Sequence, residues 1–187
     1  MKPTAVALYL ALAGFAAFSI TLKQEIRGSA AIHGTHLKIN EPAPSLTLPD
    51  RTGQTVELAE VCKKNRLVMV NFWASWCGPC RMEMPQFEKL YKAKKSEGLE
   101  ILAVSVDEDP QKLSDYLARH SFSFPILHDS KNTTAAAYGI EGLPTTVLLN
   151  SDGKVVYVYE GMQPHMDYQI DYQLKQLKDT DERKKNG

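Results

Sequence analysis

Two cysteines separated by two residues form the part of the sequence best suited to chemistry. Cys77 and Cys80 lie in the segment Trp-Cys-Gly-Pro-Cys at 76–80. The nearly continuous apolar run 67–73 predicts a buried strand before them, and apolar spacing predicts a helix over 78–96 after them. At the start of a helix, free backbone N–H groups and the helix dipole stabilise a thiolate. We therefore expect an exposed, activated Cys77, and a Cys80 whose attack releases the mixed disulfide intramolecularly.

Other roles fit this cysteine pair less well. A structural zinc site needs four ligands, and the sequence has neither a second cysteine pair nor a suitably spaced histidine pair. A passive disulfide across so short a loop adds little stability. Haem attachment requires a histidine after the second cysteine, where Arg81 stands instead. Cys62, the third cysteine, is typical of a small buried hydrophobic residue. Redox chemistry at Cys77 and Cys80 is the favoured interpretation, and no metal site is predicted.

The elements around the cysteines predict an α/β sheet with an antiparallel edge. Alternating and continuous apolar runs predict the strands, and apolar residues at helical spacing predict the helices. In chain order we expect a hairpin at 45–48 and 54–58, a strand at 67–73, a helix at 78–96, a strand at 99–106, helices at 110–120 and 133–138, a hairpin at 145–149 and 155–159, and a closing helix around 170–177.

The first residues predict a membrane segment. The run 3–22 carries no charge and is long enough, at 1.5 Å per residue, to cross a bilayer core of about 30 Å. A retained anchor is favoured over a cleaved signal peptide, whose apolar region is usually shorter, although Gly28-Ser29-Ala30 offers a cleavage site. We therefore expect an anchor or signal at 1–23, a tether at 24–40, a globular domain at 41–180 and a charged tail at 181–187.

The overall charge argues against a partner recognised by bulk electrostatics. Lys and Arg total 22, and Asp and Glu also total 22, in a chain of 187 residues. Without a net positive field the sequence predicts no binding to nucleic acid. No motif for a bound cofactor is present, so the chemistry is expected to come from the cysteines alone.

Several segments together resemble one family. Residues 71–85, Asn-Phe-Trp-Ala-Ser-Trp-Cys-Gly-Pro-Cys-Arg-Met-Glu-Met-Pro, are similar to the active-site segment of TlpA/ResA-like (DsbE/CcmG-like) thioredoxin-fold proteins. The segments 42–44, 104–107, 142–146 and 152–153 agree as well, so the resemblance covers about residues 40–180. It implies a thioredoxin fold with an N-terminal β-hairpin and a central insertion. It also implies a bacterial thiol:disulfide oxidoreductase on the extracytoplasmic (periplasmic) side of the cytoplasmic membrane.

The resemblance also implies partners and a direction of electron flow. Such proteins commonly reduce protein disulfides, including those of apocytochrome c during cytochrome c maturation, with electrons from a membrane thiol donor. Gly78-Pro79 between the cysteines is what reducing thioredoxins carry. A shallow hydrophobic groove beside Trp76 and Pro144 is the expected docking surface, with Leu143 offering its backbone to an extended substrate.

Two residues carry specific roles from the resemblance. Pro144 matches the family's cis-proline, which faces the cysteine pair. Glu83 is the candidate carboxylate that takes the proton from Cys80, because the position of the buried aspartate of ordinary thioredoxins is Asn71 here. Burial would raise the pKa of Glu83 for this task. The alternative is an exposed glutamate that only complements the helix dipole.

Two other activities on the same fold remain as alternatives. A thiol peroxidase uses one activated cysteine preceded by Pro and Thr, whereas Ser75-Trp76 precede Cys77 here. A copper or thiophilic-metal carrier for oxidase assembly spaces its cysteines by three residues and adds a histidine. The spacing of two therefore favours disulfide exchange over both.

Overall fold

The computed structural model describes residues 35–186. Its main feature is a five-stranded sheet with the strand order β5-β4-β3-β6-β7. β3, β4 and β5 run parallel, while β6 and β7 pair antiparallel, so the sheet has the antiparallel edge that the sequence predicts. The strands are β3 (Leu67–Trp73), β4 (Leu99–Ser105), β5 (Ile126–His128), β6 (Thr145–Asn150) and β7 (Val155–Glu160).

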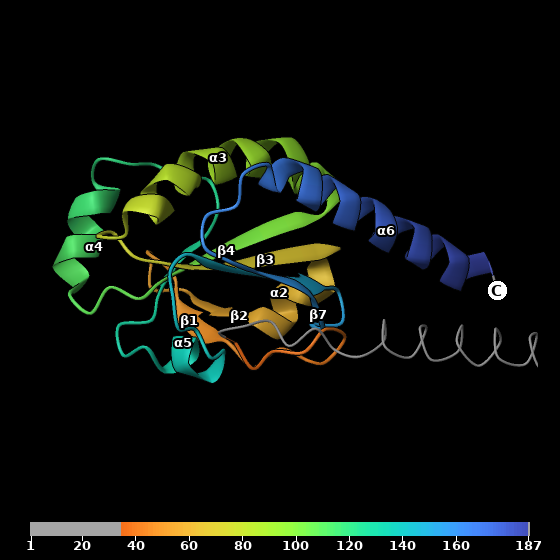
Figure 1. The fold of residues 1–187 in the computed structure, drawn as a ribbon, viewed down its shortest axis with the longest axis horizontal. Coiled ribbons are helices and arrows are strands. Elements are labelled where there is room, and N and C mark those ends of the chain that lie inside the picture. Colours follow the sequence, from red (N-terminus) through yellow and green to blue (C-terminus); the bar gives the residue numbers. More distant parts are fainter. Residues whose placement is uncertain (1–34, 187) are drawn as a thin grey trace, which may run out of the picture. The chain divides into compact units, whose positions relative to one another are not determined.

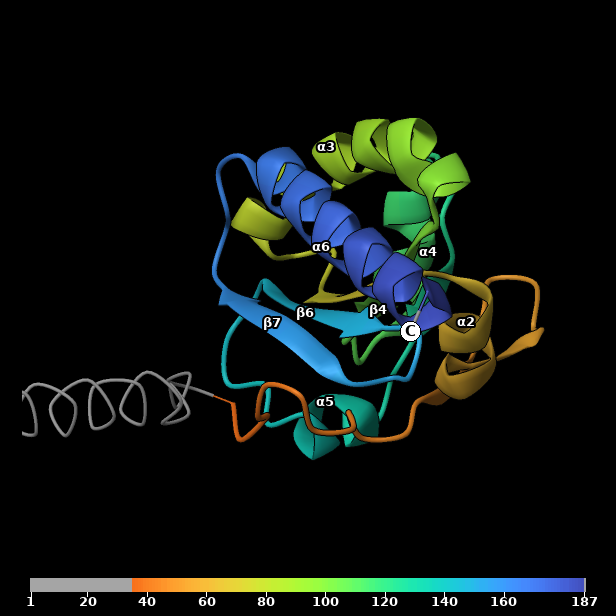
Figure 2. The same ribbon diagram turned by 90° about the vertical axis from the view of Figure 1, so that its right-hand side faces the viewer.

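Helices cover both faces of the sheet (Figure 1). One face packs against α3 (Gly78–Lys94), α4 (Pro110–Leu117) and α6 (Met166–Asn186), and a short 3₁₀ turn, Lys95–Glu97, follows α3. The other face packs against α2 (Leu58–Lys64) and α5 (Thr133–Ala137), and the end-on view shows the two layers on either side of the strands (Figure 2). A sheet covered on both faces explains why β3 is apolar at every position except Asn71: all seven of its residues are buried.

A small separate hairpin precedes this sheet. β1 (Thr47–Pro49) and β2 (Thr55–Glu57) pair antiparallel, and the carboxylate of Asp50 accepts backbone hydrogen bonds from Thr52 and Gln54 in the turn between them. The predicted second strand was wrong at its end, because Leu58 begins α2 instead. Leu37, upstream of the hairpin, is buried in the core and therefore belongs to the packed part of the chain.

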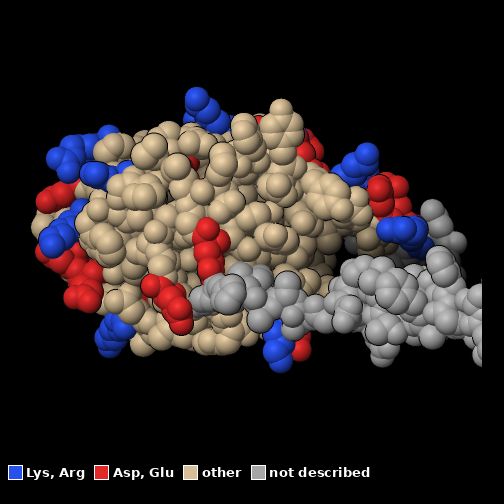
Figure 3. All heavy atoms as spheres, viewed as in Figure 1, with Lys and Arg blue, Asp and Glu red and all other residues tan. Residues whose placement is uncertain are grey.

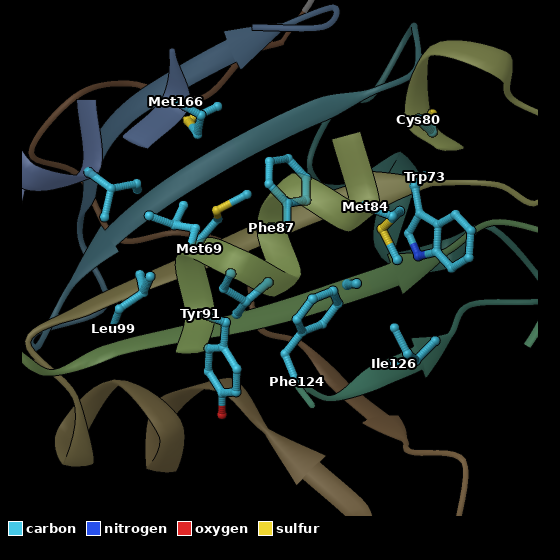
Figure 4. Packing of buried hydrophobic residues seen from close by; sticks show 14 of the residues in the cluster. Met69, Trp73, Cys80, Met84, Phe87, Tyr91, Leu99, Phe124, Ile126 and Met166 are labelled. Carbon is cyan, nitrogen blue, oxygen red and sulfur yellow. The ribbon is translucent and has the colours of Figure 1, made fainter. Parts of the chain in front are cut away.

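The hydrophobic core is divided by the sheet into two clusters. The cluster under α3 contains Trp73, the largest fully buried side chain of the described residues, together with Tyr91 and Phe87. Figure 4 shows Cys80 at the margin of this cluster, near Trp73 and Met84. The core therefore holds the first turn of α3, and this turn lies at the end of the sheet.

Several loops meet at one edge of the sheet. β3 and β4 are parallel, with Trp73 opposite Ser105, so both strands end at this edge. β6 runs antiparallel to β3 and starts at Thr145, opposite Phe72, so it begins there. The loops 74–77, 106–109 and 142–144 therefore meet at the same place, although they are far apart in sequence.

The segment between β4 and β6 holds α4, β5 and α5, where the sequence predicts an insertion. α4 ends at Leu117, earlier than the predicted 120, and β5 was not predicted. A strand of three residues is too short to show a hydrophobic period.

Within residues 35–186 no helix is long and apolar enough to cross a membrane. The predicted anchor at 3–22 lies outside the described residues.

Candidate active site

Cys77 is the residue that caps the start of α3. Its backbone is extended, its carbonyl accepts a hydrogen bond from the N–H of Arg81, and its sulfur accepts one from the N–H of Cys80 at 3.2 Å. Gly78 and Pro79 occupy the first helical positions, where a missing proline N–H does no harm. A sulfur that accepts a helix N-terminal N–H is placed where a thiolate is stabilised.

The two cysteines form a disulfide in this structure, with Cα atoms 5.3 Å apart. Cys77 is 5% exposed and Cys80 is 1% exposed, so the expectation of an exposed Cys77 is wrong for the disulfide form. The reason is that both sulfurs belong to the apolar cluster around Trp73. Trp76, by contrast, is a large hydrophobic side chain that is 63% exposed.

Glu83 is buried one turn after Cys80. Residues three apart on a helix are neighbours, with Cβ atoms about 5–6 Å apart. One carboxylate oxygen, Oε1, accepts a hydrogen bond from the N–H of Gln163 at 2.8 Å, and Oε2 has no hydrogen-bond partner among the described residues. Burial raises the pKa of Glu83 above its ordinary value, and the Gln163 bond offsets part of that rise. An exposed glutamate that only complements the dipole is excluded, since Glu83 is 2% exposed.

Asn71 occupies the place on β3 where ordinary thioredoxins carry a carboxylate. It is buried, and its amide donates a 2.9 Å hydrogen bond to the hydroxyl of Thr146 on the neighbouring β6. A neutral amide with a neutral partner cannot exchange protons near pH 7. Glu83 is therefore the buried carboxylate available on the α3 side of Cys80.

The peptide bond between Leu143 and Pro144 is cis, as predicted. Pro144 is buried at the start of β6, and its carbonyl accepts a hydrogen bond from Gly161 at 2.8 Å. Leu143 is partly exposed and shares with Trp76 a cavity of about 480 Å³. The cavity lies at the edge of the sheet where the active-site loops meet.

This cavity differs from the expected hydrophobic groove. Four carboxylate residues line it against a single lysine, and Pro144 is absent from its lining. The surface beside Trp76 is thus a mixed acidic and apolar one. Its acidic members are Asp107, Glu108, Asp109 and Glu141, and its basic member is Lys112.

Two residues that position the site, Gln163 and Asp107, were not identified as functional from the sequence. Gln163 holds Glu83 from the loop before α6, and Asp107 holds Ser75 from the loop after β4. Asp107 carried a usable signal, because it directly follows a buried parallel strand and parallel strands present their ends at one edge. Gln163 carried none, since its contribution is a backbone N–H.

The described residues show no second reactive centre. Between residues 35 and 186 no group of three or more His, Cys, Asp or Glu side chains is arranged to hold a metal ion. Cys62 lies on the other side of the sheet, in the cluster under α2, and burial raises the pKa of its thiol to about 11. The redox-competent thiols of the described chain are therefore the pair at α3.

The structure has a cysteine pair at the start of the helix that follows a central strand. It also has a cis-proline before the adjacent antiparallel strand. These two features together define the class of thioredoxin-like thiol-disulfide oxidoreductases.

Comparison with known proteins then gives the family. The family model that matches residues 39–158 is that of the AhpC/TSA family. Thiol-disulfide oxidoreductase ResA of Halalkalibacterium halodurans is 40% identical over 124 residues, which are 66% of this chain and 69% of that protein. ResA of Bacillus subtilis is 39% identical over 119 residues, 64% and 65% of the two chains.

A solved structure described as thiol:disulfide interchange protein DsbE from Chlorobium tepidum has a TM-score of 0.69 at 32% identity, covering 75% of this chain and 98% of that one. The chain belongs to the AhpC/TSA family and, within it, to the ResA-like thiol-disulfide oxidoreductases.

Proposed function

We propose that this oxidoreductase works as a reductant of protein disulfides outside the cytoplasm, with Cys77 as nucleophile, Cys80 as resolving thiol and Glu83 as proton acceptor. The observation that carries the proposal is the geometry of α3. The N–H of Cys80 in its first turn donates to the sulfur of Cys77, and its buried face places a carboxylate one turn after Cys80. Both features serve the dithiol form, which is the form that donates electrons.

The exchange proceeds in two balanced steps. The Cys77 thiolate attacks one sulfur of the substrate disulfide, forming a mixed disulfide and releasing the other substrate sulfur as a thiolate. Glu83 then accepts the proton of Cys80, and the Cys80 sulfur attacks that of Cys77. The second substrate sulfur leaves, the substrate has gained two electrons, and the enzyme holds the Cys77–Cys80 disulfide seen here.

Substrate docking is assigned to the surface around the disulfide. Trp76 offers an exposed ring, Gly78 and Pro79 expose the backbone at the start of α3, and Leu143 with Pro144 offers an extended segment. An extended peptide can pair with such a segment through main-chain hydrogen bonds. The face drawn in Figure 3 carries its Lys, Arg, Asp and Glu side chains mostly around the margin, with both signs interspersed. Contact near the disulfide rather than a bulk field is the proposed basis of recognition.

The compartment and partners extend the proposal further. The uncharged run 3–22 supports a single-pass anchor in a bacterial cytoplasmic membrane with the domain on the periplasmic side, or a periplasmic protein after signal cleavage. The family supports protein disulfides as substrates, among them apocytochrome c in cytochrome c maturation. A membrane thiol protein would return the enzyme to its dithiol form.

The test is the reduction potential of the Cys77–Cys80 pair, measured by equilibrating the protein in graded thiol–disulfide buffers. We expect a value near or below about −250 mV, in the range of reducing thioredoxins. A value near about −120 mV would make the protein an oxidant. Absence of any reversible couple would refute disulfide exchange and leave metal carriage or peroxide reduction to be tested.

A trapping experiment addresses the substrates. Replacing Cys80→Ser removes the resolving thiol, so mixed disulfides between Cys77 and natural partners should accumulate in the cell envelope. The matched control is Cys62→Ser, which leaves both active-site thiols in place and should trap nothing. Failure of Cys80→Ser to trap any protein would contradict the assignment of protein substrates.

A further inference from the structure

Asp107 is a buried carboxylate that the exchange steps above do not use. It is 1% exposed and follows the C-terminal end of β4. Its Oδ2 accepts hydrogen bonds from the N–H of Ser75 at 2.9 Å and from the hydroxyl of Ser105 at 2.7 Å, and its Oδ1 accepts one from the hydroxyl of Ser75 at 2.7 Å. Both the backbone and the side chain of Ser75 are thus held by one carboxylate.

The backbone of Asp107 is itself fixed. Its N–H donates to the hydroxyl of Ser105 at 3.1 Å, and its carbonyl accepts from Nε2 of His128 on β5 at 2.7 Å. The preceding residue, Val106, donates its N–H to the carbonyl of Trp73 at 2.9 Å. Asp107 is therefore anchored to β3, β4 and β5 and can act as a rigid support for the loop after β3.

Ser75 connects this support to the nucleophile. It lies two residues before Cys77, and only Trp76 stands between them. The two Cα–Cα steps from Ser75 to Cys77 span at most about 7 Å, so a displacement of Ser75 moves the residue that caps α3.

We propose that Asp107 is a positioning residue for the active-site loop. Through its hydrogen bonds to Ser75 it holds Trp76 and Cys77 in the geometry in which the N–H of Cys80 donates to the Cys77 sulfur. A donor directed at that sulfur stabilises the thiolate, which is the attacking form. This inference rests on the proposed function, because it assigns a role in the same exchange reaction.

The molecule contains a matched control. Asp129 is 2% exposed and also accepts three hydrogen bonds, from the N–H and hydroxyl of Thr133 at 3.1 and 3.3 Å and from the N–H of Ala135 at 2.9 Å. Its donors belong to α5 rather than to the active-site loop. Replacing Asp129→Asn therefore removes an equally buried, equally bonded carboxylate without loosening Ser75.

The experiment compares Asp107→Asn and Asp129→Asn in the full chain, first reduced and then mixed with oxidised glutathione at pH 7. For Asp107→Asn we expect the rate of glutathione reduction to fall by about tenfold, because one of the two carboxylate oxygens that accept from Ser75 becomes an NH₂ donor. The rate at which iodoacetamide alkylates Cys77 should fall with it. Asp129→Asn should lower stability only. A wild-type glutathione rate in Asp107→Asn, or an equal loss of rate in both variants, would overturn the proposal.

A second variant covers the case in which Asp107→Asn does not fold. Ser75→Ala removes only the hydroxyl hydrogen bond to Asp107 and keeps the backbone one, so it should slow glutathione reduction by a smaller factor. In the double variant the two rate effects should be less than additive, because both changes break one contact. Full additivity would argue against positioning. Failure of the proposed function would look different, since the wild-type protein itself would then show no reversible couple.

Discussion

Cys62 and Cys77 are buried to a similar degree but lie in very different surroundings. Cys62 is 1% exposed, sits inside α2 and has its thiol pKa raised by burial to about 11. Cys77 is 5% exposed, but it caps α3, receives an N–H from the first turn and has Cys80 beside it. Burial alone does not separate a reactive thiol from an inert one. The position of the sulfur relative to a helix N-terminus does.

Replacing Cys77 and Cys62 separately should give the largest difference in activity. Replacing Cys77→Ser removes the nucleophile, so we expect the rate of insulin disulfide reduction to fall by about a thousandfold or more. Replacing Cys62→Ala should leave that rate within about twofold of wild type. Insulin turbidity assays on both variants check this. A large loss of rate in Cys62→Ala, with the fold intact, would break the comparison.

Alkylation of the reduced native protein should measure the difference in reactivity between the Cys62 and Cys77 thiols. Only the thiolate reacts, and a thiol with a pKa of about 11 is ionised to about 0.1% at pH 8. We expect iodoacetamide to modify Cys77 at least about a hundredfold faster than Cys62, as followed by peptide mass spectrometry. In denaturant the two rates should converge, because both thiols then lose their surroundings. Unequal rates in the unfolded protein would place the difference in local sequence instead.

The buried carboxylate next to Cys80 should produce a smaller effect. Glu83→Gln keeps the hydrogen bond from Gln163 but cannot accept a proton, so reduction should slow by about tenfold or more above the pKa of Glu83. Below that pKa wild-type Glu83 is already protonated, and the two rates should meet. Stopped-flow measurements across pH test this. Parallel profiles at every pH would reduce Glu83 to a packing role.

Glu83→Gln should also change the stability of the protein, and this is the smallest effect that we expect. The folded-state pKa of Glu83 is raised above its unfolded value, so its contribution to stability is present below the unfolded pKa and is lost as pH rises through the folded one. Glu83→Gln does not titrate. Its free energy of unfolding relative to wild type should therefore increase as pH rises, measured by denaturant titration of the disulfide form. An opposite slope would mean that Glu83 is stabilised as a charge.

The sequence predicted most of the fold because the long elements have clear patterns. The apolar run of β3 and the helical spacing of α3 were identified with nearly correct ends. β5 and α2 were missed, since three-residue strands and short helices leave too little periodicity. For the site, the cysteine pair and Pro144 stood out because spacing and neighbours are local features. The burial of Cys77 and the acidic lining beside Trp76 did not, because both arise from distant loops.

What the sequence by itself determined was the pair of thiols and the strand and helix that carry them, because these lie within one continuous segment. The tertiary structure decided their surroundings. It buried Glu83 against the backbone of Gln163, 80 residues later in the chain, and it brought Asp107 to Ser75 across 32 residues. The physical reason is that β3, β4 and β7 all end, and β6 begins, at one edge of the sheet, so the loops beside them meet there.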